Sequence, residues 1–188
     1  ETLQSRLFVR SMVGDINLMT AVEPMRNTVY RTPYADKLIR TAQDIPDLKL
    51  IIVDPASHFR GGDENKAEDM TRFVEVLEYV SKQTGAGVLV IHHANKASMR
   101  GTEQDQSAAR GSSAFSDGIR WQMNLAAMTK DEAKAHDIPE DQRHLFLSAS
   151  QTKNNYAPPR PPVFLRRGEG GILVKADLAE RAKRKEET

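Results

Sequence analysis

Two short runs of apolar residues give the chain its clearest pattern. Residues 48–53 (LKLIIV) are almost all apolar, and residues 88–91 (VLVI) repeat the pattern. Continuous apolar runs of this length are typical of strands buried on both faces, as in a parallel sheet. Between them, apolar residues recur at helical spacing from Met70 to Val80, after Asn65 and Glu68 at capping-box spacing. Parallel strands need such a crossover, so the pattern predicts a β–α–β unit.

The rest of the chain predicts shorter elements. A strand is expected at 7–9 and a helix at 35–43, whereas residues 10–33 show no clear period. Residues 94–113 are polar and small, which predicts a long loop, and such loops are usually functional or disordered. The remaining expectations are order over 114–128, a helix from 129 ended by Pro139, a strand over 144–150, a hairpin formed by 163–165 and 172–174, and a charged tail over 180–188.

Together these elements predict an α/β fold. We expect a mostly parallel central sheet flanked by helices, with an antiparallel hairpin near the C-terminus. No internal repeat and no clear boundary interrupts the pattern, so residues 1–188 are expected to form a single domain.

Composition narrows the classes of function. The 188 residues are 39% hydrophobic and 28% charged, which is ordinary for a soluble globular protein. The absence of cysteine excludes a disulfide scaffold, a thiolate metal site and a cysteine nucleophile, and it fits a cytoplasmic protein. No apolar run approaches the roughly 20 residues that cross a membrane. A net charge of +1 leaves any nucleic-acid binding to local patches.

Candidate chemistry lies where the two apolar strands end. Asp54 directly follows the first strand, and His92 and His93 follow the second. Open α/β sheets bind ligands at the carboxyl ends of their strands, where such an aspartate either holds Mg²⁺ as a Walker B residue or caps a turn. A histidine there can hydrogen-bond a γ-phosphate or a water. Zinc is disfavoured because adjacent strand residues diverge, and a packing role is favoured for His92.

Cations in the predicted loop form a second candidate site. Lys96, Arg100 and Arg110 stand among small residues and can contact DNA phosphates. Glu103 and Asp105 weaken a basic patch, so a solvated loop is the stronger expectation from these residues alone.

Two further cations stand in or beside predicted strands. Arg120 lies in an apolar stretch, where burial requires a carboxylate, an aromatic face or a phosphate as partner. If that partner is ATP on a neighbouring subunit, Arg120 is an arginine finger. Lys153 could reach a phosphate in trans and Tyr156 could pack on a base, or both could serve a turn.

One expected signature is absent. A Walker A loop has the form G-x-x-x-x-G-K-[ST], because backbone N–H groups and the lysine hold the phosphates. None of the 11 glycines is followed by lysine, and Pro55 rather than a general base follows Asp54. Residues 1–188 alone are expected not to hydrolyse ATP.

From about Leu48 onward, the chain resembles the RepA-type hexameric replicative helicases of broad-host-range plasmids and their phage and prophage relatives. The stretches that carry the resemblance are LIIVDPASHF, FVEVLEYVSKQTGAGVLVIHHANKAS, ARGSSAFSDGIRWQMNLAAMT, and TKNNYAP followed by FLRRGEGGIL. They cover residues 48–178 in order. The double histidine, the RGSS-to-RW block and the K-x-N-Y block are together more specific than any single motif.

This resemblance implies a partial RecA-like P-loop NTPase fold in a six-subunit ring, with ATP and Mg²⁺ between subunits and single-stranded DNA in the channel. It matches Asp54 with the Walker B aspartate, His93 with the γ-phosphate sensor and Arg120 with the arginine finger. Lys153 matches a basic position near the same phosphates, and residues 97–111 match the loop that faces the channel. In the family, the Walker A loop and the strand that bears the catalytic glutamate come first. The resemblance therefore implies that these parts precede Glu1 in a longer parent, or that a separate chain supplies the loop. Two alternatives stay open, namely a non-enzymatic DNA-binding or ring-assembly module, and a RecA-fold ATPase of recombination.

Overall fold

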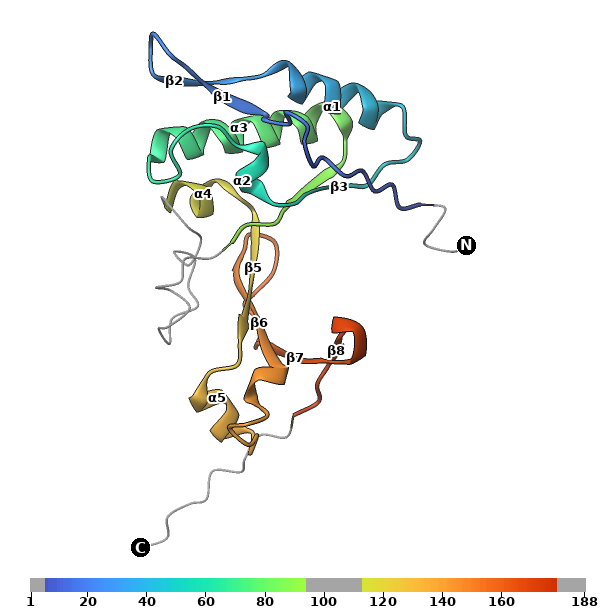
Figure 1. Ribbon diagram of the computed structural model, residues 1–188, viewed down its shortest axis with the longest axis vertical. Coiled ribbons are helices and arrows are strands. Elements are labelled where there is room, and N and C mark those ends of the chain that lie inside the picture. The colour runs from blue at the N-terminus through green and yellow to red at the C-terminus, as the bar shows by residue number, and fades with distance from the viewer. Residues whose placement is uncertain (1–5, 94–112, 179–188) are drawn as a thin grey trace, which may run out of the picture. The chain divides into compact units, whose positions relative to one another are not determined.

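The computed structural model describes residues 6–93 and 113–178. They fall into two compact units, Glu1–His93 and Ala94–Thr188 (Figure 1). In neither described range is a helix long and apolar enough to cross a lipid bilayer.

The first unit combines an antiparallel hairpin, helices and a pair of parallel strands. Helix α1 packs on α3, and α3 also contacts β1, β2 and β4. In chain order the elements are β1 (Thr20–Glu23), β2 (Thr28–Arg31), α1 (Pro33–Gln43), β3 (Leu50–Val53), α2 (Ala56–Phe59), α3 (Ala67–Thr84) and β4 (Gly87–Val90).

The helices of this unit begin and end at residues suited to those positions. The Thr32 hydroxyl accepts from Tyr34 N–H and Pro33 occupies the first turn, so α1 begins at Pro33, two residues before the expected start, and ends at Gln43 as predicted. Gly85 ends α3 with φ of 71°, a left-handed conformation that glycine adopts without strain. The capping box expected at Asn65 and Glu68 is not formed, because the N-cap of α3 is Lys66 without a side-chain bond.

The predicted β–α–β unit is present, but as a small parallel sheet and not as the expected mostly parallel central sheet, because the other strands of the described residues pair antiparallel. Strands β3 and β4 pair in parallel, with Leu50 opposite Gly87 and Val53 opposite Val90. The expected burial of β3 on both faces is wrong within this chain. Val53 is 2% exposed, but Leu50 and Ile52, two residues apart on one face, are 48% and 54% exposed.

Two expectations for the first 33 residues also differ from the structure. Residues 7–9 form no strand and are exposed, since no strand pairs with them. The region without a clear period instead contains the β1–β2 hairpin, in which Val22 pairs with Val29. Asn27 in its turn has φ of 51°, which asparagine tolerates better than most residues.

The second unit is built on an antiparallel sheet of strand order β5-β6-β7-β8. The predicted C-terminal hairpin is confirmed as β7 and β8, which form half of this larger sheet. Its core cluster contains Met128, Ala133 and Phe146. Besides two short 3-10 turns, the elements are α4 (Ser113–Gly118), β5 (Trp121–Ala127), α5 (Lys130–Ala135), β6 (Phe146–Asn154), β7 (Val163–Arg167) and β8 (Leu173–Lys175).

The start of α5 follows the sequence prediction closely. Thr129 Oγ1 accepts from Glu132 N–H over 3.2 Å, and Glu132 Oε2 accepts from Thr129 N–H over 2.7 Å. This reciprocal capping box places α5 directly after β5, where Ala133 packs with Met128 and Phe146.

Candidate functional site

The two parallel strands end at one edge of their sheet. Val53 pairs with Val90, and Ile91 N–H donates to Val53 O over 2.9 Å. Asp54 directly follows Val53 at the end of β3. His93 lies two residues after Ile91, just past the end of β4. Asp54 and His93 are therefore attached to the same carboxyl edge, the edge at which open α/β sheets bind ligands.

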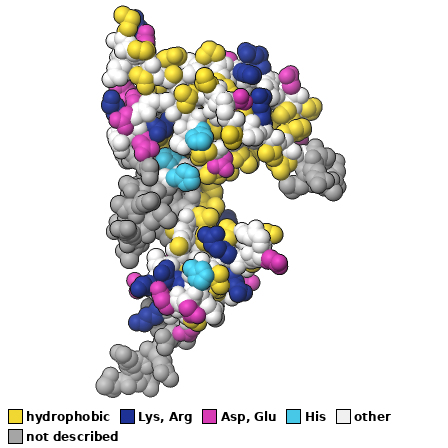
Figure 2. Space-filling model, in the orientation of Figure 1, with side chains coloured by type: hydrophobic (Ala, Val, Ile, Leu, Met, Phe, Trp, Pro, Cys, Tyr) yellow, Lys and Arg dark blue, Asp and Glu magenta, His cyan; other side chains and the backbone are white. Residues whose placement is uncertain are grey.

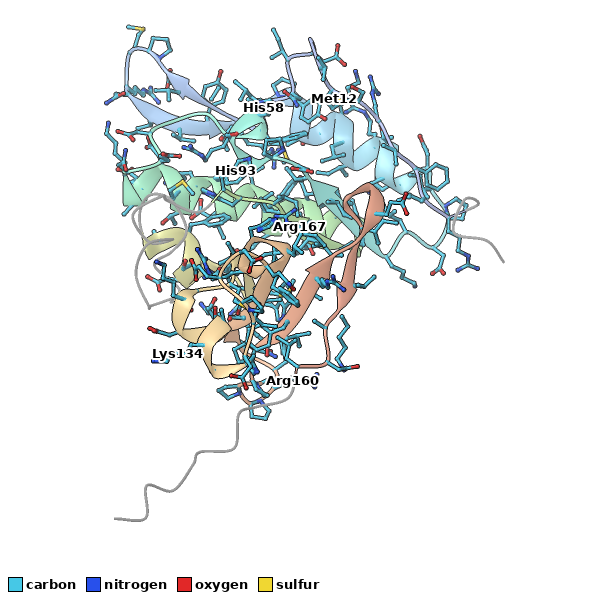
Figure 3. All side chains as sticks on the ribbon, turned by 60° about the horizontal axis from the view of Figure 1, so that its bottom comes forward. Met12, His58, His93, Lys134, Arg160 and Arg167 are labelled. Atoms are coloured by element: carbon cyan, nitrogen blue, oxygen red, sulfur yellow. The ribbon has the colours of Figure 1, made fainter. Side chains whose placement is uncertain are left out.

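The side chains of Asp54 and His93 are both exposed. His93 is labelled in Figure 3, and Figure 2 shows histidine side chains at the surface of this unit. The two described ranges contain no group of three or more His, Cys, Asp or Glu side chains that could hold a metal ion. Magnesium needs no such group, because one carboxylate with waters and substrate phosphates is a common Mg²⁺ arrangement.

His92 differs from its neighbour in being half-buried. Its Nδ1 lies 2.9 Å from the carbonyl oxygen of His93, and since a carbonyl only accepts, Nδ1 carries the proton in this contact. Burial lowers the pKa of the imidazole, and the bond to the His93 carbonyl partly opposes that change. The lowered pKa favours the neutral form of the His92 imidazole. The bond from its Nδ1 orients the backbone at His93.

In the second unit, Arg120 immediately precedes β5. Asn155 N–H, just past the end of β6, donates to Arg120 O over 3.0 Å. The guanidinium is exposed, so the cost of burial expected from the apolar sequence around it does not arise. No ion pair joins Arg120 to another residue in 113–178.

Lys153 lies at the same corner of the antiparallel sheet. It pairs across the strands with Gln122, and its Nζ donates to Ser116 O over 2.8 Å and to Asp117 O over 2.9 Å. These carbonyls belong to the last turn of α4, which a cation stabilises. The Lys153 ammonium thus links α4 to β6. Lys153 lies two residues before Asn155, whose N–H donates to Arg120 O.

The structure says little about the other candidate site residues. Lys96, Arg100 and Arg110 lie outside the described residues. Tyr156 is 79% exposed, and its N–H donates to Asn154 Oδ1 over 2.9 Å, which is a turn contact.

Sequence reasoning missed one charged pair near the histidines. Arg60 Nη2 lies 3.2 Å from Glu64 Oε2, and the charges of both act on His92. The available signal was the spacing of four residues in RGGDE just after the Asp54 strand. That spacing alone indicates no role, because the glycines within it disfavour a helix face.

Comparison with known proteins identifies the family. A family model described as an AAA domain matches residues 2–99, slightly more than half of the chain. The chain belongs to the AAA domain family. The match to the AAA domain begins well before Leu48, where the resemblance of individual motifs begins, and it includes Asp54 and His93.

Two solved structures resemble this AAA domain chain in fold. One, described as an ATPase domain, has 13% sequence identity and a TM-score of 0.58, over 77% of this chain and 51% of that one. The other, a DnaB-like replicative helicase described with its interactions with primase, has 13% identity and a TM-score of 0.57, over 75% of this chain and 34% of that one. The chain is thus a mixed α/β protein resembling a RecA-like helicase ATPase domain, and it spans about half or less of each relative.

Proposed function

We propose that the chain is the nucleotide-responsive part of a ring-forming, ATP-dependent DNA helicase that moves on single-stranded DNA. The observation that carries this proposal is the shared carboxyl edge of β3 and β4, from which Asp54 and His93 both extend. Membership of the AAA domain family and the likeness in fold to helicase ATPase domains support it.

The exposed side chains of Asp54 and His93 are of chemical types that bind a magnesium nucleotide. Asp54 would hold Mg²⁺ through water, and the His93 imidazole would hydrogen-bond the terminal phosphate. The bound nucleotide would supply the phosphoryl group that is transferred to water. Because the chain lacks a G-x-x-x-x-G-K-[ST] loop, it holds the phosphates only in part, and we propose that another segment completes the cradle.

The corner of the second unit would act on a neighbour's nucleotide. The exposed guanidinium of Arg120 is free to reach out of its subunit and stabilise charge on the phosphates. Lys153 would add positive charge and keep the corner in place through its two carbonyl contacts. Lys96, Arg100 and Arg110 would contact the DNA backbone, where cations bind without reading sequence.

The strand-edge site is tested by nucleotide titration of the isotope-labelled chain, followed by NMR. Millimolar MgATP should shift the His93 ring resonances more than MgADP does, because only ATP carries the γ-phosphate. Asp54→Asn should remove this difference. Asp47→Asn makes the same change just before β3, at the other end of the strand, and should retain it.

Two results would count against the proposal. Equal responses to MgATP and MgADP, or a response that Asp54→Asn leaves intact, would remove His93 and Asp54 from nucleotide binding. Salt-dependent retention on single-stranded DNA without any such nucleotide response would instead favour a non-enzymatic DNA-binding module.

A further inference from the structure

The segment from Arg60 to Lys66, between α2 and α3, starts close to the end of β4. Ala56, the first residue of α2, donates its N–H to Ile91 O over 2.8 Å. Helix α2 ends at Phe59, about one turn or roughly 6 Å further along. Arg60 is the first residue of this segment, and it therefore lies within about one helical turn of the backbone that leads into His92.

Backbone contacts hold this segment in one position. Met19 N–H donates to Phe59 O over 2.7 Å, and Gly61 N–H donates to Thr20 Oγ1 over 3.0 Å. At the other end, Asp63 N–H donates to the buried carboxylate of Asp69 over 2.7 Å. These contacts, made with the start of β1 and with α3, fix the backbone on both sides of Arg60 and directly before Glu64.

Arg60 is buried within these anchors. Its side chain is only 8% exposed, with Nη1 donating to Gly62 O over 3.1 Å and Nη2 to Glu64 Oε2 over 3.2 Å. The Glu64 side chain is 26% exposed. Since removing one partner of a buried ion pair is unfavourable, Arg60 holds the Glu64 carboxylate in a defined place.

We propose that Arg60 and Glu64 are positioning residues of the strand-edge site, in which Arg60 fixes the Glu64 carboxylate beside His92 and the pair balances the charge there. The two charges oppose each other at His92. Arg60 lowers the pKa of the His92 imidazole and Glu64 raises it, and the neighbouring His93 also lowers it.

The balance matters for an anionic ligand, and this part of the inference rests on the proposed function. An ion pair has no net charge, so it neither repels nor attracts a triphosphate strongly. Glu64 without Arg60 would repel phosphates at this edge, whereas Arg60 without Glu64 would attract them. His92, whose Nδ1 contacts His93 O, transmits changes in this local charge to the backbone of His93.

The positioning role is tested without nucleotide, by NMR titration of the His92 ring in the intact chain. Glu64→Gln should lower the pKa of His92, and Arg60→Gln should raise it. The double variant should return it toward the wild-type value. Glu68→Gln removes an exposed carboxylate from the first turn of α3 and serves as the matched control.

A Glu64→Gln shift no larger than that of Glu68→Gln would overturn the proposal. If Arg60→Gln does not fold, as judged by its amide spectrum, Glu64→Gln decides alone because glutamine keeps the size and shape of the side chain. Shifts of opposite sign in the two single variants support the proposal.

Titrating the same samples with MgATP separates this inference from the proposed function. Glu64→Gln should bind MgATP more tightly than wild type and Arg60→Gln more weakly. Altered His92 titration with no response of His93 to MgATP in any sample would overturn the proposed function alone. A response of His93 with unaltered His92 titration would overturn the positioning role alone.

Discussion

Lys153 and Ser116 are 37 residues apart in the chain, yet the Lys153 ammonium donates to the Ser116 carbonyl over 2.8 Å. A second bond, to Asp117 O over 2.9 Å, makes Lys153 the cap of α4. The same residue was expected to reach phosphate in trans. Within 113–178 its structural role is thus to join α4 to the sheet corner that carries Arg120.

Replacing Lys153 should therefore loosen this corner even without nucleotide. Lys153→Met keeps much of the aliphatic stem but loses two charge-assisted bonds, so it should lower the free energy of unfolding by about 1–3 kcal/mol. Fluorescence of Trp121, the chain's single tryptophan and the neighbour of Arg120, can follow unfolding in urea. Lys175→Met, which removes an exposed ion pair with Asp177, should cost less than about 1 kcal/mol. Equal losses would deny Lys153 this role.

Arg120→Ala should separate stability from activity. The side chain is exposed, so its removal should change the free energy of unfolding by no more than about 0.5 kcal/mol. In an assembly with subunits that carry a Walker A loop, the same variant should reduce ATP turnover by about 10³–10⁵-fold. Arg167→Ala, an exposed arginine of β7 labelled in Figure 3, is the control. A comparable loss with Arg167→Ala would remove the special role of Arg120.

The β–α–β unit could be predicted because its signals are long and consistent. Two apolar runs, an amphipathic helix between them and Gly85 at its end all agree, and the structure contains each of them. The β1–β2 hairpin was missed because its strands have four residues each, too few to establish a period. The strand expected at residues 7–9 failed because strand formation depends on a partner, which local sequence does not encode.

The candidate site likewise has features that the sequence predicts and features that it does not. The edge shared by Asp54 and His93 follows from parallel pairing alone, so sequence was sufficient to predict it. The direction of the Lys153 side chain depends on where α4 ends, and the Arg60–Glu64 pair depends on anchors at Thr20 and Asp69. Such long-range contacts leave no periodic trace in the sequence.

Gly61 should be intolerant of any side chain. A Cβ there would lie 2.4 Å from Thr20 O and 2.9 Å from Ala21 Cα, both backbone atoms that cannot move independently. Gly61→Ala should lower the free energy of unfolding by about 1–3 kcal/mol through overpacking, measured by thermal or urea unfolding. Gly87→Ala is the control, because its nearest contacts would be an ordinary 3.6 and 3.7 Å. Similar stability of the two variants would contradict the close approach of β1.

Thr129 should contribute to stability through the capping box of α5. Thr129→Ala leaves the N–H of Glu132 without its hydroxyl partner, and such changes cost about 1 kcal/mol. Urea unfolding followed by Trp121 fluorescence provides the measurement. Lys134→Ala, an exposed substitution on the same helix, should fall within about 0.5 kcal/mol of wild type. A neutral Thr129→Ala would mean that the cap contributes nothing to folding.

The environment of His92 should make stability depend on pH. Burial lowers its pKa in the folded state, so the unfolded chain takes up this proton more readily. Stability should fall as pH drops below about 6.5, the ordinary histidine pKa, and this contribution should level off below the lowered folded pKa. His92→Asn removes the titrating group and should show a smaller loss of stability between about pH 7.5 and about pH 5. Urea unfolding monitored by circular dichroism measures the stability of both proteins.

His58→Asn changes an exposed histidine of α2 and should keep the wild-type dependence of stability on pH. Because acidic groups contribute equally to all three proteins, an identical pH dependence in wild type and His92→Asn would show that burial at the end of β4 has no energetic effect.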